Sequence, residues 1–196
     1  MAKRHRKFWQ YLANLFSVLL IVGAIGAGTF VYLRWLWREQ RYNQIIEQVA
    51  ATEGVDKFLI KAVMRQESGF DPLARSSKGA AGLMQVMPGT GKDWALATRC
   101  SNFTPDALRN ETVNVQAGAW YLGRALRYWQ GIGVDNPVPF ALAEYNAGRS
   151  KVLHWLPKGQ ATTAEEFKKA ISYPSVRHYI ERVTEFHETY KAAGRL

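Results

Sequence analysis

Hydrophobic residues follow two different patterns along the chain. Residues 15–33 read LFSVLLIVGAIGAGTFVYL, a run of 19 residues without a charge. As a helix, this run would span about 28 Å, close to the thickness of a hydrocarbon core. Beyond it, apolar residues recur at spacings of three and four, and the alternation typical of strands is absent. The sequence therefore predicts an all-α protein in which a single N-terminal transmembrane helix precedes a helical domain.

The residues that flank the apolar run support a membrane span. Aromatic residues lie on both sides of it, as interfacial belts do: Trp9, Tyr11, Tyr32, Trp35 and Trp37. A cleaved signal peptide is the alternative, because residues 24–28 are small, but the apolar run continues beyond them to Leu33. Four basic residues precede the run and three follow it closely, which favours a cytoplasmic N-terminus. We expect a cytoplasmic basic tail at 1–14, a transmembrane helix at 15–33, a linker at 34–41 and one domain at 42–196.

Helix boundary signals divide the domain into a series of helices joined by one long loop. Ser, Thr, Asp and Pro mark the expected starts, and Gly marks several expected ends. The Gly- and Ser-rich segment 76–91 is expected to be a loop. Helices are expected from Tyr42 to about Gly54, from Asp56 to Ser68, from Pro105, over 113–129 with an end at Gly131, over 139–145, after caps at Ser150 and Thr163, and over 175–192.

Charge and metal-ligand residues exclude several classes of function. The net charge is +10, but residues 1–41 supply seven basic residues against one acidic residue, or +6, so the domain carries only +4. An exported domain with so small an excess is not expected to bind nucleic acid. The single cysteine, Cys100, rules out an internal disulfide, and the four histidines lack metal-ligand spacing. We expect no metal and no cofactor.

Glu67, in the stretch MRQESGF, occupies a position where a leucine would be expected. Helical steps back from it reach Val63, Ile60 and Leu59, so the carboxyl group continues an apolar stripe. Burial would raise its pKa and suit it to donate a proton near neutral pH. The alternative is that Glu67, in the last turn before Gly69, simply reaches water.

Three further stretches carry candidate chemistry, each with a structural alternative. In the loop SSKGAAGLMQVMP, Gly79 and Gly82 permit close backbone approach and Gln85 offers a donor and an acceptor; alternatively, the loop is a connection in which Met84 fills a core gap. The stretch AEYNAG, residues 143–148, brings together a carboxyl group, a phenol and an amide. Alternatively, Asn146 and Gly148 simply end a helix. In YPSVRHYIERV, Tyr179 is a candidate functional or core residue and Ser175 a good N-cap.

Taken in order, these stretches resemble the catalytic domain of the soluble lytic transglycosylases, relatives of goose-type lysozyme. Glu67-Ser68 corresponds to the family's Glu-Ser, residues 76–85 follow its Ser-x-x-Gly-Ala-x-Gly-Leu-Met-Gln, and residues 143–148 contain its Tyr-Asn-Ala-Gly. Further matches are the central-helix residues Asn114, Gly118, Tyr121 and Leu122, and the final tyrosine, Tyr179. The likeness extends over 42–190. Two departures are Glu144, where a small residue is common, and Pro174-Ser175, where Glu-Thr is usual.

The resemblance implies a lysozyme-like α domain that cleaves the β-1,4 bond between N-acetylmuramic acid and N-acetylglucosamine in peptidoglycan. Glu67 would act as the single acid and base, first protonating the leaving oxygen and then deprotonating the muramyl C6 hydroxyl, which closes a 1,6-anhydro ring. By the same resemblance, Ser76 and Gln85 position the sugar and Met84 shapes the groove wall. Asn146, Tyr145 and Tyr179 are expected to hold Glu67 or the acetamido group.

Glu144 and the reaction class leave alternatives open. Glu144 either modulates the pKa of Glu67 or is an exposed carboxylate at a helix end. A goose-type hydrolase would need water and a second carboxylate, for which Asp71 and Asp93 are candidates, although Asp71-Pro72 looks like a turn and Asp93 like first-turn helix charge. A membrane-tethered wall-binding module without activity is a further alternative.

The predicted anchor and the resemblance together give an expected location and expected partners. The protein would be single-pass in the bacterial inner membrane, with the catalytic domain in the periplasm or otherwise outside the membrane. Peptidoglycan glycan strands are the expected substrate. Other cell-wall or secretion-apparatus proteins are candidate partners, in either a general or an assembly-linked role.

Overall fold

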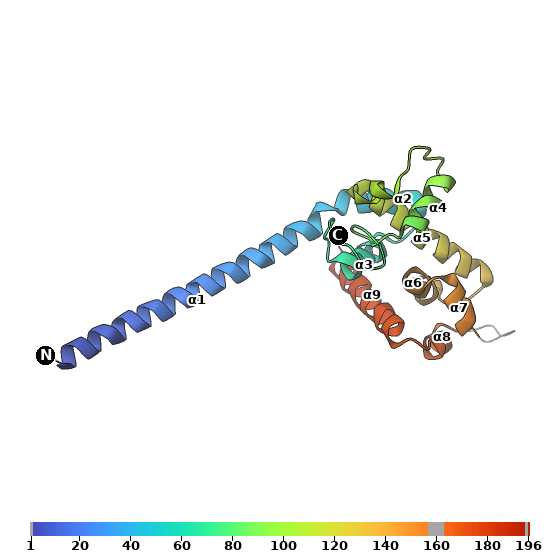
Figure 1. Ribbon diagram of the computed structural model, residues 1–196. Coiled ribbons are helices and arrows are strands. Elements are labelled where there is room, and N and C mark those ends of the chain that lie inside the picture. The colour runs from blue at the N-terminus through green and yellow to red at the C-terminus, as the bar shows by residue number, and fades with distance from the viewer. Residues whose placement is uncertain (1, 157–162, 195) are drawn as a thin grey trace. The chain divides into compact units, whose positions relative to one another are not determined.

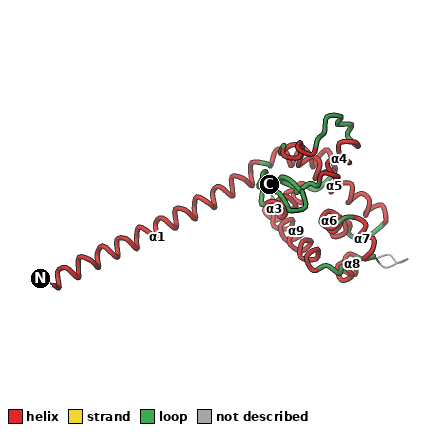
Figure 2. The backbone as a smooth tube through the Cα atoms, in the orientation of Figure 1, coloured by secondary structure: helices red, strands yellow, loops and turns green. Residues whose placement is uncertain are grey.

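The computed structural model describes residues 2–156, 163–194 and 196, and these residues form helices joined by loops (Figures 1 and 2). The chain divides into two compact units, residues 1–41 and residues 42–196. The elements are α1 (Ala2–Arg41), α2 (Asn43–Glu53), α3 (Lys57–Ser68), α4 (Pro88–Ala97), the 3-10 helix η1 (Pro105–Arg109), α5 (Glu111–Ile132), α6 (Pro137–Ala147), α7 (Arg149–Trp155), α8 (Ala164–Ala170) and α9 (Pro174–Ala193).

The first unit is the single helix α1, which has 40 residues. Its apolar side chains are exposed through the segment predicted to cross a membrane; Leu19, for example, is 61% exposed. Within the described residues, one helical stretch, Trp9–Glu53, is long and apolar enough to span a bilayer, with a mean hydropathy of 2.1 in its most apolar window. The expected linker, 34–41, is helical and ends α1.

Local signals place the ends of α2 and α3 where the sequence predicts them. Gly54 and Gly69 end these helices with φ angles of 65° and 57°, the left-handed conformation that glycine adopts readily. Asp56 caps α3 by accepting a hydrogen bond from the backbone N–H of Phe58 at 2.8 Å. Thr163 and Glu166 form the predicted capping box at the start of α8.

Several other predicted boundaries are wrong by a few residues. The predicted loop 76–91 is too long, since Pro88 begins α4, and α5 continues past Gly131 to end at Gly133. Neither Ser150 nor Ser175 is a cap. Helix α7 starts one residue before Ser150, and Pro174 at the first position of α9 places the cap at Tyr173. Pro105 opens a 3-10 helix in place of an α-helix.

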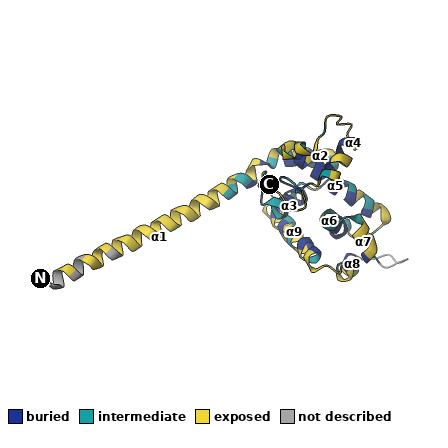
Figure 3. Ribbon diagram, viewed as in Figure 1, coloured by how far each residue is buried: buried dark blue, intermediate teal, exposed yellow. Residues whose placement is uncertain are grey.

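The core of the second unit surrounds α6. Residues 140–144 of this short helix are all fully buried, because α6 packs against α5, α7, α8 and α9. Aromatic rings continue the core across three of these helices: Trp129 stacks on Phe140 at 5.4 Å between centroids, and Phe140 on Phe167 at 4.1 Å. Figure 3 shows that buried residues lie mainly on inward helix faces of this unit. Helices α3 and α9, distant in sequence, pack side by side.

A buried asparagine holds the loop between α3 and α4 in place. The Asn114 side chain, fully buried on α5, accepts a hydrogen bond from Met84 N at 2.8 Å and donates to the carbonyl oxygens of Ala81 at 2.7 Å and Leu108 at 2.9 Å. Gly82 permits this approach, because a Cβ atom there would lie 2.4 Å from Asn114 Nδ2. The loop is thus fixed through its backbone groups.

We expect Asn114→Ala to lower the free energy of unfolding by about 3 kcal/mol, because it removes three buried hydrogen bonds, to the N–H of Met84 and the carbonyl oxygens of Ala81 and Leu108. Denaturant unfolding measures this change. Gln116→Ala, on the exposed face of the same helix, is the matched control and should change the value by less than about 0.5 kcal/mol. Equal effects of the two changes would contradict a special role for Asn114.

Candidate active site

Glu67 lies at the end of the apolar stripe of α3, as the sequence predicts. Leu59, Ile60 and Val63 on this stripe are 2%, 0% and 0% exposed, whereas Glu67 is only partly buried. The carboxyl group therefore sits where the core meets the surface. Gly69 ends the helix two residues later and lets the chain turn away.

Tyr179 of α9 holds the Glu67 carboxyl group directly. Its hydroxyl donates a hydrogen bond to Glu67 Oε1 at 2.6 Å, and the tyrosine is itself only 5% exposed. The bond crosses the interface between α3 and α9, 112 residues apart in sequence. Of the residues expected to hold Glu67, Tyr179 is the one with a hydrogen bond to it in the described part of the chain.

Burial raises the pKa of Glu67 to about 7, and the hydrogen bond from Tyr179 opposes this rise by stabilising the ionised form. Near neutral pH the carboxyl group is therefore divided between its acid and base forms. That balance suits a group that gives up a proton in one step and takes one back in the next.

Tyr145 lies near Glu67 but binds a different group. Its hydroxyl donates to the carbonyl oxygen of Met84 at 2.8 Å, and its ring lies 5.6 Å from that of Tyr121. Burial, with the nearby charges of Glu67 and Tyr121, raises the pKa of Tyr145 well above its ordinary value, so this hydroxyl remains protonated. Gly118 makes room for the contact, since a Cβ atom there would lie 3.0 Å from the Tyr145 hydroxyl oxygen.

The loop residues predicted to contact sugar are largely engaged in the loop itself. Ser76 Oγ accepts hydrogen bonds from the backbone N–H groups of Ala80 at 3.0 Å and Lys78 at 3.3 Å. Gln85 Nε2 donates to the carbonyl oxygens of Ala74 and Gly82. The Gln85 backbone has a φ of 47°, unusual outside glycine, which this clamp helps to maintain.

The prediction that the Met84 side chain forms a groove wall is wrong. Met84 is 0% exposed and fills the core beside Gly118, as the structural alternative held. Met84 contributes near Glu67 through its backbone: its carbonyl oxygen accepts a hydrogen bond from the Tyr145 hydroxyl, and its N–H donates one to the Asn114 side chain.

Asn146 differs from Met84, because it is exposed near the end of α6. The φ of 86° and ψ of 149° at Gly148 are not the left-handed helical cap that the sequence suggested.

Glu144 is not an exposed helix-end carboxylate. It is 0% exposed and forms a two-pronged ion pair with Arg149, in which Arg149 Nη2 lies 2.9 Å from Oε1 and Nε lies 3.1 Å from each carboxylate oxygen. Trp129 Nε1 also donates to Oε2 at 2.9 Å, and the Arg149 guanidinium stacks on Tyr128 at 3.8 Å from the ring centroid. Glu144 therefore has a dedicated counterion, and the rise in the pKa of Glu67 comes from burial.

Three residues support the site in ways that the sequence did not predict, although Ser68 and Asn114 match the family pattern. Asn114 fixes the loop, Arg149 neutralises Glu144, and Ser68 joins the end of α3 to the loop by donating to the Leu83 carbonyl oxygen at 2.8 Å. A polar residue at 114, on the helix face that also carries Ala117 and Gly118, was the available signal for the first. Arg149 follows Glu144 by five residues across a helix break, so no periodic rule pairs them.

Asp71 and Asp93, the candidates for a second catalytic carboxylate, lie in a turn and on an exposed helix face. Asp71 Oδ1 accepts from the backbone N–H of Leu73 at 3.1 Å, which is the predicted turn. Asp93 is exposed and lies beyond the first turn of α4, so its expected place in that turn is wrong. No group of three or more His, Cys, Asp or Glu side chains suited to a metal occurs in the residues that the structure describes.

We expect Arg149→Met to lower the free energy of unfolding by about 3 kcal/mol, because it leaves the fully buried Glu144 without a counterion. Thermal or denaturant unfolding measures the loss. Arg182→Met is the matched control, since it removes an arginine that pairs with the exposed Glu185, and the expected change is below about 1 kcal/mol. A loss no larger at 149 than at 182 would contradict the proposed dependence on the ion pair.

The raised pKa of Glu67 predicts a dependence of stability on pH. Between the ordinary value near 4.5 and the folded value of about 7, the folded protein holds a proton that the unfolded chain has lost, so stability falls as pH rises. Relative to Glu67→Gln, the wild type should lose up to about 3 kcal/mol between about pH 4 and pH 8. Tyr179→Phe should move the upper end of this window to higher pH, because it removes the hydrogen bond that favours the ionised form. A stability difference independent of pH would contradict the burial of the carboxyl group.

Comparison with known proteins agrees with the helical fold. Over 152 residues the chain is 29% identical to soluble lytic murein transglycosylase of Escherichia coli K12, covering 76% of this chain and 23% of that protein. It is 37% identical over 121 residues to membrane-bound lytic murein transglycosylase C of Histophilus somni strain 2336, a match that covers 59% of this chain and 33% of that protein. The chain thus spans about a quarter to a third of the length of these relatives.

Solved structures and a family model lead to the same group. An inactive mutant of the lytic transglycosylase Slt from Pseudomonas aeruginosa superposes with a TM-score of 0.69 at 29% identity, covering 76% of this chain and 24% of that one. The model of the transglycosylase SLT domain matches residues 44–168, most of the second unit. Because this match covers more than half of the chain, the protein belongs to the transglycosylase SLT domain family.

Proposed function

We propose that the chain is a peptidoglycan lytic transglycosylase that cleaves the β-1,4 bond between N-acetylmuramic acid and N-acetylglucosamine without consuming water. The observation that carries the proposal is the partly buried Glu67, whose pKa is raised to about 7 and whose Oε1 accepts a hydrogen bond from Tyr179. Membership of a family whose named relatives are lytic murein transglycosylases supports this choice of reaction.

The geometry at Glu67 supports a division of labour between its two carboxyl oxygens. Because Tyr179 donates to Oε1, the proton of the neutral carboxyl group belongs on Oε2. Oε2 then donates this proton to the glycosidic oxygen while positive charge develops at C1 of the muramic acid. The same hydrogen bond stabilises the carboxylate that results, which lowers the energy of the transferred state.

The second step returns the proton to Glu67. The carboxylate takes the proton of the muramyl C6 hydroxyl as the C6 oxygen attacks C1, which closes the 1,6-anhydro ring and restores the acid. Since the nucleophile belongs to the same sugar, its attack has the entropic advantage of proximity. The substrate acetamido carbonyl can stabilise C1 between the two steps, so one protein carboxyl group suffices.

The remaining site residues are proposed to orient the glycan. Asn146 is exposed beside Tyr145, and its amide suits the acetamido group of the substrate. Gln85 uses its Nε2 within the loop, which leaves its carbonyl oxygen for a sugar hydroxyl. Ser76 is an exposed residue of the same loop, and its hydroxyl keeps a proton to donate because the loop uses the oxygen as an acceptor. Tyr145 acts by holding the Met84 carbonyl group, and thereby the loop, beside Glu67.

We further propose that residues 15–33 anchor the enzyme in the inner membrane, with residues 42–196 facing the periplasm. The exposed apolar length of α1 and a relative named as membrane-bound support the anchor. Hydrolysis by a second carboxylate is less well supported, because Asp71 is engaged in a turn and Asp93 is exposed on α4.

Digestion of purified sacculi tests the reaction. Wild type should release muropeptides one water lighter than hydrolytic products, as mass spectrometry detects, and Glu67→Gln should lower the rate by about a thousandfold or more because it keeps the shape but removes the acid. Glu181→Gln, an exposed carboxyl change on α9, should retain full activity. Hydrated products would identify a hydrolase, and full activity in Glu67→Gln would remove Glu67 from the mechanism.

A further inference from the structure

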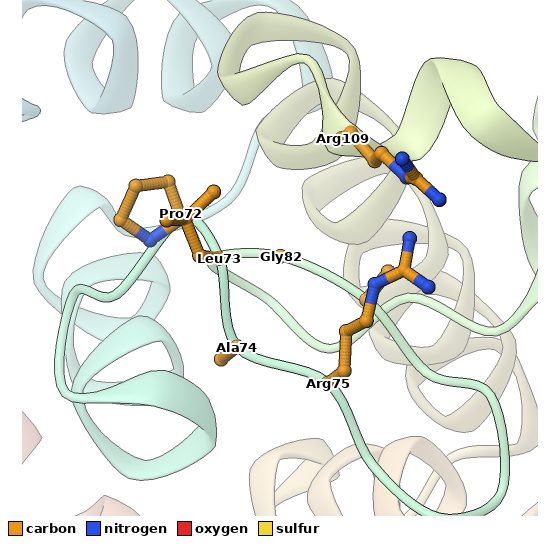
Figure 4. Close-up of a pocket in the computed structure, with 7 residues that line it drawn as sticks. Pro72, Leu73, Ala74, Arg75, Gly82 and Arg109 are labelled. Atoms are coloured by element: carbon orange, nitrogen blue, oxygen red, sulfur yellow. The ribbon is translucent and has the colours of Figure 1, made fainter.

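A second cluster of functional groups lies on the outer side of the loop between α3 and α4. It is a pocket of about 150 Å³, and Figure 4 shows the residues that line it. Pro72, Leu73 and Ala74 form an apolar part of the lining. Arg75 and Arg109 supply its charged groups, and in Figure 4 their guanidinium groups extend toward one another. Neither arginine takes part in the chemistry proposed at Glu67.

The two charged side chains that line the pocket are both positive. Arg109 pairs with Asp106 at 3.2 Å, but both side chains are largely exposed, at 61% and 81%, so this pair is weak. Arg75 has no ion pair or hydrogen bond from its side chain within the described part of the chain. Two guanidinium groups that face one space repel each other unless an anion lies between them. A carboxylate fits this demand, because it can accept hydrogen bonds from two guanidinium groups at once.

The backbone under the pocket is held firmly. Gly82 N donates to the Ala74 carbonyl oxygen at 2.9 Å, and Gln85 Nε2 donates to the same oxygen at 3.0 Å. Arg75 and Ala81 form an isolated β-bridge. The backbone that carries Arg75 is therefore fixed before any ligand arrives, which reduces the entropy lost on binding.

The same loop joins the pocket to the end of α3. Ser68, the neighbour of Glu67, donates to the Leu83 carbonyl oxygen, and Leu83 follows Gly82 of the pocket lining. One loop thus contacts the end of α3 and also lines the pocket, and a peptide of four or five residues on a bound sugar extends roughly 13–18 Å from it.

We infer that the Arg75–Arg109 pocket binds a carboxylate of the peptide stem of peptidoglycan, with the alkyl part of the stem residue against Pro72 and Leu73. This inference rests on the proposed function for its substrate class. A long polyanion is less suited to the site, because Asp106, which pairs with Arg109, would repel a continuous negative chain. The pocket would make the enzyme prefer glycan that carries peptide with free carboxylates.

Binding to the full-length Glu67→Gln protein in detergent tests the inference by calorimetry. The probes are a disaccharide tetrapeptide with free carboxylates, the same compound with its carboxylates amidated, the disaccharide without peptide, and inorganic phosphate. The free-carboxylate form should bind about tenfold more tightly than the amidated form, a difference of about 1.4 kcal/mol. Adding Arg75→Gln and Arg109→Gln should abolish that difference and leave affinity for the peptide-free disaccharide unchanged.

The control is Lys92→Gln, which removes one exposed positive charge elsewhere in the same unit and should retain the tenfold preference. Equal binding of the free and amidated forms, a preference that survives loss of both arginines, or no binding of either form would overturn the inference. Displacement by phosphate at equal concentration would identify a general anion site and would also overturn it. Failure of the wild type to release anhydro products, with the carboxylate preference intact, would overturn the transglycosylase reaction alone.

Discussion

The hydrogen bond from Tyr179 to Glu67 is the contact on which the site depends. It crosses the interface between α3 and α9 and joins groups 112 residues apart, so it forms only when these two helices pack together. The core that packs them also removes water from one side of the carboxyl group and raises its pKa to about 7. The apolar packing that stabilises α3 against α9 therefore also raises the pKa of Glu67.

A second requirement is that the loop between α3 and α4 keeps its shape without regular secondary structure. The loop between α3 and α4 has backbone hydrogen bonds of its own, such as the pair between Ala81 and Val86, and side chains from other elements hold further backbone groups. Asn114 satisfies three backbone groups, Tyr145 satisfies the Met84 carbonyl group and Ser68 that of Leu83. Glycines at 82 and 118 permit these approaches. Much of the recognisable motif thus consists of residues whose observed contacts build the loop.

How much the sequence predicted follows from the range of the interactions involved. The ends of α3 depend on Asp56 and Gly69, which act within a few residues, and both were predicted correctly. The position of Glu67 followed from the helical period, again a local property. The burial of Met84 and Glu144 was misjudged, because it depends on other segments of the chain. Met84 packs beside Gly118 of α5. Glu144 binds Trp129 and Arg149. The pairing of Tyr179 with Glu67 was reached through family resemblance, since no spacing rule connects them.

Glu144 shows why a second carboxyl group so near the site in sequence need not be part of its chemistry. A buried carboxylate without a counterion would either take up a proton or disturb its neighbours electrostatically. Glu144 has such a counterion: Arg149 forms a two-pronged ion pair with it, Trp129 donates a further hydrogen bond, and the guanidinium is partly exposed at the surface. The last turn of α6, with Tyr145 and Asn146, is tied through Glu144 to the start of α7. An ion pair that contributes modestly to net stability can still fix the direction of these two side chains, because a shift of the helix end would leave a charge buried alone.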